Sequence, residues 1–336
     1  MVKQYKVMKK ISIVIPCRNE AKYIANCIYS LLDNIPKDCD VEILVIDGMS
    51  TDGTRKIVED IITNNVHVKM IDNHDIVTPN ALNLGVNNAT GEYTMIASAH
   101  SSFEPKYIEK LMNAMDRLNA DVVGGFMQTA IKNITPKALA IKEVISCKFG
   151  VGNAMFRVGV EKEELVDTVP FGLYKTDLFK EIGGYDNRLI RNHDIELSKR
   201  LIAAGKKIYL IPDALCTYYA RETFGAIAQN NYRNGLWNIL TVKITKNFSS
   251  LSLRHFIPLI FLLSLILPSA FAALWWPLCL ISALSLTCYL LALCLISLKL
   301  AVTKKLNFFY LSWTFIVLHF SYATGSLVGI FKHVKK

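Results

Sequence analysis

The feature that most constrains this chain is a long uncharged segment near its carboxyl end. Phe256 to Leu298 is a run of 43 residues without Asp, Glu, Lys or Arg, and an α-helix needs about 20 apolar residues to cross the hydrocarbon core of a bilayer. This run is long enough for two spans, and a second uncharged run of 26 residues, Leu306 to Phe331, predicts a third. The predicted spans are residues 256–275, 277–298 and 306–331.

Positive charge is concentrated around these runs. Residues 251–336 hold seven Lys or Arg and no Asp or Glu, so they supply +7 of the net charge of +10 and leave +3 for residues 1–250. The positive charge therefore indicates residues at the edge of a membrane, and it argues against a nucleic-acid-binding face. Lys and Arg are enriched in cytoplasmic loops. Cations precede the first span, at Lys243, Lys246 and Arg254, and follow the second, at Lys299, Lys304 and Lys305. We therefore expect a domain on the cytoplasmic side of the inner or plasma membrane of the cell.

The last residues leave the number of crossings open. Lys332, Lys335 and Lys336 draw the C-terminus to the cytoplasm, whereas three spans would place it on the other side. We prefer three spans over two spans with a re-entrant third segment. In either case the sequence predicts a multi-pass protein anchored by its tail. The expected divisions are a cytoplasmic domain at 1–220, amphipathic interface helices at 221–254 and a transmembrane region at 255–336.

The first part of the chain alternates between strand and helix patterns. Runs rich in β-branched residues at 11–16 and 43–46 flank a segment, 20–33, whose apolar residues recur at helical spacing. The alternation continues with a helix at 54–64, a strand at 66–71, a helix at 79–89, a strand at 93–97 and a helix at 105–118. This order predicts an α/β fold, with a mostly parallel Rossmann-like sheet covered by helices on both faces. Ligands of such sheets bind at the carboxyl ends of the strands.

Polar turns follow the first two predicted strands. Pro16 to Glu20 follow the first strand, and Asp47 to Thr54 follow the second. A carboxylate at a strand end, followed by a Gly, Ser and Thr turn into a helix, can bond a base or ribose and direct the amino end of the helix toward phosphate. Either turn alone is typical of an ordinary capped βα connection. Two of them, one βα unit apart, predict a nucleotide site.

Further motifs follow in order through about residues 11–240. They are Ile13–Pro16 with Asn19 and Glu20, Asp47–Thr54, Pro79–Gly85 with Gly91–Tyr93, Val166–Gly172, Ile182–Asp186, Asn192–Leu197 with Arg200, and Gln229–Arg233 with Gly235 and Trp237. With these motifs the sequence resembles the family 2 inverting glycosyltransferases, which have the A-type nucleotide-sugar fold. The resemblance is strongest to the membrane-bound branch represented by the succinoglycan-biosynthesis glucosyltransferase.

The resemblance implies a donor pocket and a catalytic base. Asp47 would contact the uracil, and Asp194 would be the general base. Inversion needs a carboxylate that removes the acceptor's proton while the acceptor oxygen attacks C1 of the sugar from the face opposite the nucleotide. An exposed Asp that opens a helix is otherwise only a charge that offsets the helix dipole. The implied donor-binding residues are Pro16, Arg18, Asn19, Glu20, Asp47, Ser50, Asp52, Asn80 and Ser98.

The acceptor and diphosphate side would be formed by four residues: Glu196, Gln229, Arg233 and Trp237. Glu196 can hold an acceptor hydroxyl or form only a salt bridge, and the sequence leaves both open. Residues 221–247 interleave apolar side chains with Arg and Lys, which is typical of an amphipathic helix at a membrane surface. Arg233 in this segment also suits anionic lipid headgroups.

One motif departs from the family. After the fourth strand the family has Asp-x-Asp, or Asp-Ala-His in this branch, to hold a divalent cation, whereas this chain has Ser98-Ala99-His100. A serine hydroxyl is a weak ligand for Mg²⁺, which prefers carboxylate oxygens. Three explanations stay open: His100 binds Mn²⁺ together with the diphosphate, arginines replace the metal, or donor binding has been lost. The arginines concerned are Arg18, Arg157 and Arg233.

These residues predict an enzyme that moves a hexose from a UDP-sugar to a lipid-linked acceptor, a polyprenyl phosphate or diphosphate, in surface polysaccharide synthesis. The alternative, which rests on Ser98, is a catalytically silent scaffold in a glycan-assembly complex. A transporter is excluded because no charged residue lies within a predicted span. Membrane lipids are a further expected partner, nucleic acid is not, and association with itself or with other glycan-assembly proteins stays open.

Overall fold

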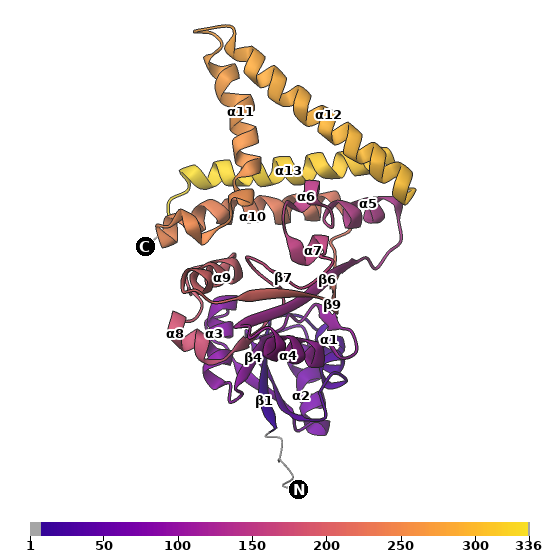
Figure 1. The fold of residues 1–336 in the computed structure, drawn as a ribbon, viewed down its shortest axis with the longest axis vertical. Coiled ribbons are helices and arrows are strands. Elements are labelled where there is room, and N and C mark those ends of the chain that lie inside the picture. Colours follow the sequence, from indigo (N-terminus) through magenta and orange to yellow (C-terminus); the bar gives the residue numbers. More distant parts are fainter. Residues whose placement is uncertain (1–7, 335–336) are drawn as a thin grey trace. The chain divides into compact units, whose positions relative to one another are not determined.

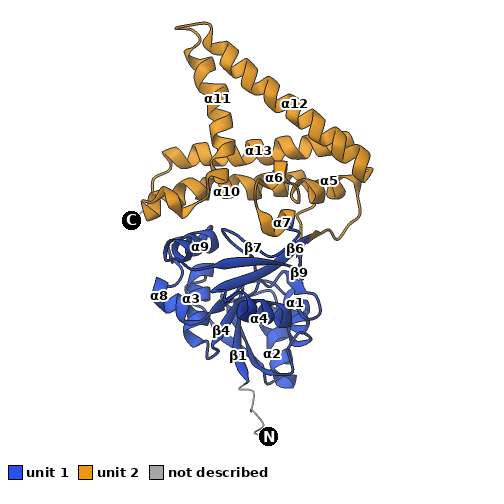
Figure 2. Ribbon diagram, viewed as in Figure 1, with its two compact units in different colours: residues 1–128, 159–218 blue, residues 129–158, 219–336 orange. Residues whose placement is uncertain are grey.

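The computed structural model describes residues 8–334, and the chain divides into two compact units (Figure 2). The first, here called the sheet unit, comprises the chain up to Gln128 together with Gly159–Tyr218. The second, here called the helical unit, comprises Thr129–Val158 and the chain from Tyr219 onward. The helical unit begins its second segment at Tyr219 and also includes residues 129–158. The predicted domain boundaries at residues 220 and 254 stay predictions.

The sheet unit is built on a mixed sheet of nine strands within the described residues, in the order β3-β2-β1-β4-β8-β6-β9-β5, with β7 beside β9 (Figure 1). The strands are β1 (Lys9–Cys17), β2 (Cys39–Asp47), β3 (Val68–Asp72), β4 (Tyr93–Ile96), β5 (Ser101–Phe103), β6 (Val122–Ala130), β7 (Glu164–Leu165), β8 (Leu173–Lys175) and β9 (Ile208–Tyr219). Strands β1 to β4 run parallel, and β8 pairs antiparallel with both β4 and β6. The predicted α/β class is confirmed, with the parallel arrangement limited to the first four strands.

Helices of the sheet unit pack directly on these strands. They are α1 (Ile24–Leu32), α2 (Thr54–Asn64), α3 (Thr78–Asn88), α4 (Tyr107–Arg117), α8 (Asp177–Ile182) and α9 (His193–Ala203). Helix α3 approaches the sheet closely at Gly85, where an added Cβ would come within 2.3 Å of Val14 on β1 and 3.1 Å of Ile46 on β2. The glycine thus sets the position of α3 against the first two strands.

As far as residue 334, where the described chain ends, the helical unit contains two four-residue helices, α6 and α7, and five longer ones. The helices are α5 (Pro136–Val144), α6 (Lys148–Val151), α7 (Met155–Val158), α10 (Phe224–Thr245), α11 (Ile257–Phe271), α12 (Leu278–Lys304) and α13 (Phe308–Phe331), with 3₁₀ turns at Phe248–Ser250 and Leu253–His255. Each segment predicted as a span corresponds to one of the last three helices, but α12 continues six residues beyond the predicted end at Leu298. Helices α12 and α13 are long and apolar enough to cross a membrane, whereas α11, with 15 residues, is shorter.

A buried carboxylate ties the parallel strands together. Glu42 on β2 is only 7% exposed. Its Oε1 accepts hydrogen bonds from the Ser12 hydroxyl on β1 (2.7 Å) and from the Thr90 amide (2.8 Å) and hydroxyl (2.6 Å), while Lys69 Nζ lies 3.1 Å from Oε2. Burial alone would raise the pKa of Glu42, but these hydrogen bonds outweigh it and lower the pKa to about 2.

The Glu42 network should make stability depend on acid. The folded pKa of about 2 lies below the ordinary value of 4.5, so the ionised carboxylate stabilises the fold above pH 4.5, and this contribution is lost as the pH falls toward 2. A shift of this size corresponds to about 3 kcal/mol. We expect Glu42→Gln to lose about that much at pH 7 and progressively less below pH 4.5. Urea-induced unfolding of the full chain in detergent measures this difference. The exposed Glu59→Gln is the control, and a Glu42→Gln deficit that is equal at pH 3 and pH 7 would contradict the assignment.

Candidate active site

The carboxyl ends of the parallel strands meet at one edge of the sheet. Cys17, Asp47 and Asp72 are direct register partners across β1, β2 and β3. The amide of Ala97 donates to the carbonyl of Val14 at 2.9 Å, so the chain after β4 leaves beside β1. The loops that follow these four strands therefore lie side by side, and three of them carry predicted donor-binding residues. These loops are residues 18–23, 48–53, 73–77 and 97–100.

The first two loops are joined by hydrogen bonds through the predicted residues. The Asn19 amide donates to the Ser50 hydroxyl at 2.9 Å, and Asn19 Oδ1 accepts from the Thr51 amide at 2.8 Å. The amide of Ala21 donates to Asp52 Oδ2 at 3.1 Å. Asn19 adopts a positive φ of 56°, which asparagine tolerates better than most residues. Asn19, Ser50 and Asp52 are thus brought together as the frame of the paired loops.

Asp47 lies beneath this frame rather than on its surface. Its carboxylate is buried and accepts hydrogen bonds from the Ser50 amide (3.0 Å) and hydroxyl (2.5 Å) and from Arg55 Nη1 (2.7 Å). The same Arg55 nitrogen lies 2.7 Å from Asp72 Oδ1. The hydrogen bonds that Arg55 donates to Asp72 and Asp47 raise the pKa of Arg55. Contact between Asp47 and uracil stays a prediction, and it would require these bonds to rearrange.

Arg55 was not among the predicted site residues. It follows directly after the Asp47–Thr54 motif, and its bonds to Asp47 and Asp72 join the ends of β2 and β3. The signal that points to it is a cation in the first turn of the helix that follows a strand ending in Asp. Its contacts make it a positioning residue for the second loop.

The fourth loop brings a histidine and a carboxylate together. His100 Nδ1 lies 2.9 Å from Glu20 Oε2, and the imidazole packs edge-on against Tyr23, with ring centroids 5.4 Å apart. His100 is half exposed, so the pair faces solvent. Ser98 is half-buried, and its carbonyl accepts from the Ser101 amide at 2.9 Å, which turns the chain toward His100.

An imidazole beside a carboxylate is a donor set that suits Mn²⁺. Within residues 8–334 no group of three or more His, Cys, Asp or Glu side chains is placed to hold a metal. The pair His100 and Glu20 therefore fits a cation whose remaining ligands come from the diphosphate or water. It does not fit a cation held by the protein alone.

The remaining predicted donor residues line the same edge. Pro16 is half-buried near the end of β1, and Arg18 is exposed and lies against Gly48, where an added Cβ would be 3.3 Å from Arg18 Cβ. Asn80 Nδ2 in α3 donates to Asp75 at 2.8 Å, whereas its Oδ1 is buried without a hydrogen-bond partner in the described residues. Because buried polar atoms are nearly always paired, this oxygen is a candidate partner for a ligand, and the donor-binding role of Asn80 stays a prediction.

Asp194 occupies the first turn of α9 and is exposed. The preceding residue, His193, has a lowered pKa, mainly because burial disfavours its charged form, so it is neutral near pH 7. Its ring packs edge-on against Tyr185, with centroids 5.8 Å apart. Asp194 is therefore a solvent-facing carboxylate held on a helix end that is itself anchored in the core.

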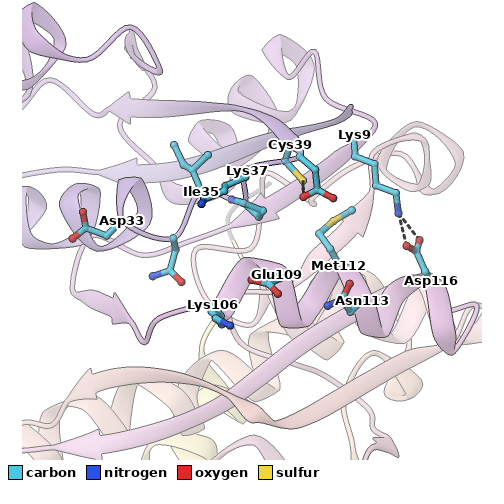
Figure 3. Close-up of a pocket in the computed structure, with 13 residues that line it drawn as sticks. Lys9, Asp33, Ile35, Lys37, Cys39, Lys106, Glu109, Met112, Asn113 and Asp116 are labelled. Atoms are coloured by element: carbon cyan, nitrogen blue, oxygen red, sulfur yellow. Dashed lines mark hydrogen bonds and ion pairs between the residues drawn. The ribbon is translucent and has the colours of Figure 1, made fainter. Parts of the chain in front are cut away.

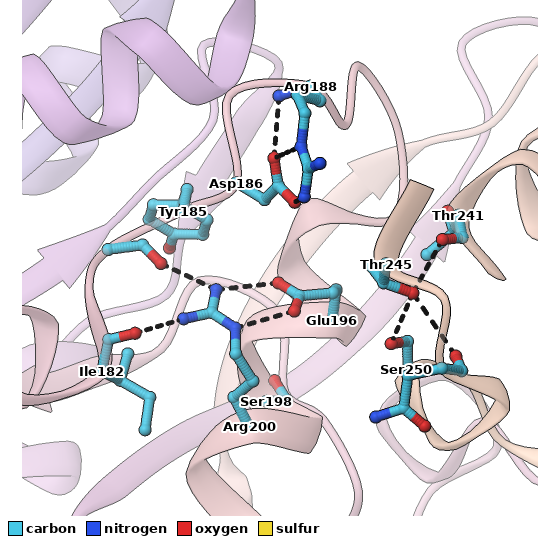
Figure 4. A network of polar contacts seen from close by, with 12 residues as sticks. Ile182, Tyr185, Asp186, Arg188, Glu196, Ser198, Arg200, Thr241, Thr245 and Ser250 are labelled. Atoms are coloured by element: carbon cyan, nitrogen blue, oxygen red, sulfur yellow. Dashed lines mark hydrogen bonds and ion pairs between the residues drawn. The ribbon is translucent and has the colours of Figure 1, made fainter. Parts of the chain in front are cut away.

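Arg200 fastens this helix to the rest of the sheet unit (Figure 4). Its Nε and Nη2 donate to the two carboxylate oxygens of Glu196 at 2.7 and 2.8 Å, and Nη1 and Nη2 donate to the carbonyls of Ile182 (2.5 Å) and Gly184 (2.7 Å). The next residue, Tyr185, exchanges two hydrogen bonds of 2.8 Å with Asn83 on α3. The network thus connects α9, which carries Asp194, to α3 at the donor edge.

The geometry bears on the two roles left open for Glu196. The residue is 5% exposed, and both of its oxygens are bonded to Arg200. The structure therefore contains the salt bridge. A role in holding an acceptor hydroxyl stays a prediction, and it would require part of this ion pair to open.

The other predicted acceptor residues belong to the helical unit. Gln229, Arg233 and Trp237 follow one another at every fourth position of α10 and so share one face of the helix. Gln229 and Arg233 are exposed and Trp237 is half-buried. Arg157 lies on α7 in the same unit. Their roles toward an acceptor or a diphosphate stay predictions.

A cavity of about 660 Å³ lies at the opposite end of β1 (Figure 3). It is lined by Lys9, by residues 33–39 and by one side of α4. The nine residues of β1 separate Lys9 from Cys17 by about 26 Å. None of the predicted site residues lines this cavity, so the loops at the carboxyl edge remain the candidate nucleotide site.

A mixed α/β sheet whose parallel strands carry joined polar loops at their carboxyl ends is the arrangement of a nucleotide-binding site. Residues 12–183, just over half of the chain, match the sequence profile described as Glycosyl transferase family 2. The chain belongs to this family.

Two named relatives show which kinds of protein this chain is similar to. The chain is 29% identical over 252 residues to dolichyl N-acetyl-alpha-D-glucosaminyl phosphate 3-beta-D-2,3-diacetamido-2,3-dideoxy-beta-D-glucuronosyltransferase of Methanococcus voltae, which covers 69% of this chain and 77% of the relative. It is 32% identical over 211 residues to succinoglycan biosynthesis protein ExoA of Rhizobium meliloti. That match covers 62% of this chain and 63% of the relative, so the chain spans less than two thirds of its length.

A solved structure shares the fold. The crystal structure of GalNAc-T7 with UDP, GalNAc and Mn²⁺ superposes with a TM-score of 0.52 at 17% identity, over 64% of this chain and 44% of the solved chain. The likeness supports the A-type nucleotide-sugar fold that the sequence motifs predict.

Proposed function

We propose that this glycosyltransferase moves a hexose, with inversion, from a UDP-sugar to a lipid-linked acceptor at the cytoplasmic face of the cell membrane. The acceptor class is a polyprenyl phosphate or diphosphate, and the pathway is surface polysaccharide synthesis. The single observation that carries the activity is the exposed carboxylate of Asp194 on a helix fastened to the donor edge. The names of the two relatives, one a dolichyl phosphate glycosyltransferase and one a succinoglycan biosynthesis protein, support the acceptor class and pathway.

In the proposed reaction, the joined loops hold the nucleotide and Asp194 removes a proton. Helix α2 begins after Gly53, and its first amide, that of Thr54, donates to Asp52 Oδ1 at 3.1 Å. The later backbone N–H groups of its first turn would therefore be the ones that face an anionic diphosphate. The unpaired Asn80 Oδ1 accepts a hydrogen bond from the donor. Asp194 takes the proton of the acceptor hydroxyl as that oxygen attacks C1, and UDP leaves on the opposite face.

A divalent cation, Mn²⁺ or Mg²⁺, would be held by His100 and Glu20 together with the diphosphate. When bound, it would neutralise the negative charge that develops on the departing UDP. Glu20 then supplies the carboxylate that Ser98 lacks.

The cation assignment predicts a change in metal binding. Removal of His100 or neutralisation of Glu20 deletes one of the two protein ligands, and we expect His100→Ala and Glu20→Gln each to weaken Mn²⁺ binding at least tenfold in the presence of UDP. Electron paramagnetic resonance of free Mn²⁺ measures this independently of turnover. His74→Ala is the matched control, because His74 is an exposed histidine in a loop at the same edge. If Mn²⁺ binds all four proteins equally, the metal ligands are not His100 and Glu20.

The proposed function is tested by transfer to lipid. The full chain in nanodiscs is given a panel of radiolabelled UDP-sugars and a polyprenyl-phosphate-linked sugar, and label in the organic phase is counted. We expect one UDP-sugar to label the lipid, with the opposite anomeric configuration in the product. Failure to bind UDP and to label any lipid would favour the scaffold, which rests on Ser98.

A further inference from the structure

Helix α10 is too polar to cross a bilayer. Seven of its residues carry amide or cationic side chains: Gln229, Asn230, Asn231, Arg233, Asn234, Asn238 and Lys243. Ionisable side chains at the bilayer centre cost several kcal/mol each. Gln229 and Arg233 on α10 are exposed, so the helix keeps polar side chains toward water, as expected at a membrane surface.

Helix α13 lies against α10 with the two backbones in contact (Figure 1). A Cβ added to Gly235 of α10 would come within 1.9 Å of the Tyr322 carbonyl, and one added to Gly325 of α13 within 2.0 Å of the Tyr232 carbonyl. The Ser326 hydroxyl donates to the Gly235 carbonyl at 3.1 Å. Small residues at such positions allow helices to approach closely. The pair is therefore a tightly packed unit.

The contact continues along both helices in the same direction. At their amino ends, the rings of Phe224 and Tyr310 lie 6.2 Å apart. At their carboxyl ends, Lys243 Nζ donates to the carbonyls of Gly329 (2.9 Å) and Ile330 (2.6 Å). Two parallel helices in contact over this length have the same orientation in a membrane. Since α10 does not cross, α13 does not cross either.

The second side of α13 is covered by other helices. Leu311, Phe315 and Leu318 are buried in a cluster with residues of α5. His319 Nε2 lies 2.8 Å from the Phe149 carbonyl of α6. In the most apolar stretch of α13, 39% of the residues are buried, compared with 11% in α12. Much of the apolar surface of α13 is thus already buried by protein.

Helices α11 and α12 form a hairpin with the opposite character (Figure 1). Their polar groups face each other, since the hydroxyls of Ser264 and Ser285 lie 2.7 Å apart. Phe261 also stacks on Tyr289 across the pair, with centroids 4.6 Å apart. Large aliphatic side chains cover the outside. Those on α12 with at least half of their surface exposed are Leu280, Ile281, Leu284, Leu291, Leu295, Leu298 and Val302. Such a surface is stable in hydrocarbon and not in water.

We propose that the chain crosses the bilayer twice, through the hairpin of α11 and α12, and that α13 lies with α10 in the interface with its exposed side against lipid. The 15 residues of α11 rise about 22 Å, and residues 272–277, with exposed Trp275 and Trp276, complete the crossing at the far surface. Two crossings return Lys332 to the side of α10. This removes the conflict between an odd number of spans and the basic C-terminus. The alternative is three crossings, in which α13 also spans the bilayer. The depth of residues along α13 distinguishes the two arrangements.

The test measures depth along α13 in the full chain. Trp313, Thr324 and Phe331 are exposed and lie within about 20° of one face of the helix. Each is replaced with Cys in a chain whose exposed Cys279, Cys288 and Cys294 are Ala, spin-labelled and placed in nanodiscs. Collision with oxygen and with a nickel chelate then reports bilayer depth. We expect the same shallow depth at all three sites. A label at Leu284→Cys on α12 is the reference for a deep position. A span would move the label by about 27 Å over these 18 residues, so an unequal depth overturns the proposal.

A second measurement distinguishes the side of the C-terminus. Lys332→Cys in the same background is treated with an impermeant maleimide in spheroplasts and in inside-out vesicles. We expect labelling only in the vesicles, whereas Trp275→Cys at the hairpin tip is labelled only in spheroplasts. Labelling of Lys332→Cys from outside would establish three crossings. The background without an added cysteine gives the baseline.

Discussion

Replacing Asp194 with Asn is expected to lower kcat for sugar transfer about 10²- to 10⁴-fold while leaving the affinity for UDP unchanged. An amide has nearly the size of the carboxylate but does not take a proton from the acceptor hydroxyl. Asp194 is exposed and lies in the first turn of α9, so the substitution removes no buried contact. Transfer to lipid measures kcat, and calorimetric titration with UDP shows that the donor edge is intact.

A matched variant separates catalysis from the effect of charge at a helix end. Asp177 is also an exposed carboxylate in the first turn of a helix, α8, and its nearest cation, Lys180, is 3.8 Å away and exposed. Asp177→Asn should leave transfer unchanged. If Asp194→Asn retains the full rate as well, Asp194 only offsets the helix dipole, and the base must be sought elsewhere.

The parallel half of the fold was predictable because each element repeats over enough residues to show its period. The helix expected at 54–64 is α2, Thr54–Asn64, and the strands expected at 11–16 and 43–46 lie within β1 and β2. Ends differ by a few residues, as for helix 20–33, which begins at Ile24. Local patterns determine these elements because each one is long enough to show its period, even though β1 also pairs with the distant β4.

The antiparallel half was not predictable from such patterns. Strand β8 has three residues, Leu173–Lys175, which is too short for an alternation to be recognised. It pairs with Tyr93–Met95 on one side and Val122–Val123 on the other, across large sequence separations. Tertiary pairing therefore places β8, and its antiparallel direction makes the sheet mixed.

The positions of the candidate-site loops could be predicted from the strand ends. The contacts that these loops make with one another could not. The bonds from Arg55 to Asp47 and Asp72 depend on the register of β2 against β3. The pairing of His100 with Glu20 depends on the register of β4 against β1. The position of α13 on α10 likewise depends on small residues, such as Gly235 and Gly325, that are 90 positions apart in the sequence.

Replacing Arg200 with Met is expected to give the largest loss of stability. Glu196 is buried, and breaking a buried ion pair on one side costs about 3–5 kcal/mol because a charge is left unpaired. The carbonyls of Ile182 and Gly184 also lose their donors. Urea-induced unfolding of the full chain in detergent measures the change. Arg188→Met is the control, since its pair with Asp186 is largely solvent-exposed on the arginine side and is expected to contribute about 0–1 kcal/mol.

The double variant Arg200→Met with Glu196→Leu then decides the role of Glu196. Replacing a whole buried ion pair with apolar side chains is often neutral, so we expect the double variant to recover most of the stability lost in Arg200→Met. If Glu196 serves only the salt bridge, sugar transfer recovers together with stability. Transfer that stays absent in a stable double variant, with UDP still bound, would assign Glu196 to the acceptor, because the ion pair would then be dispensable for folding while its carboxylate remained necessary for the reaction.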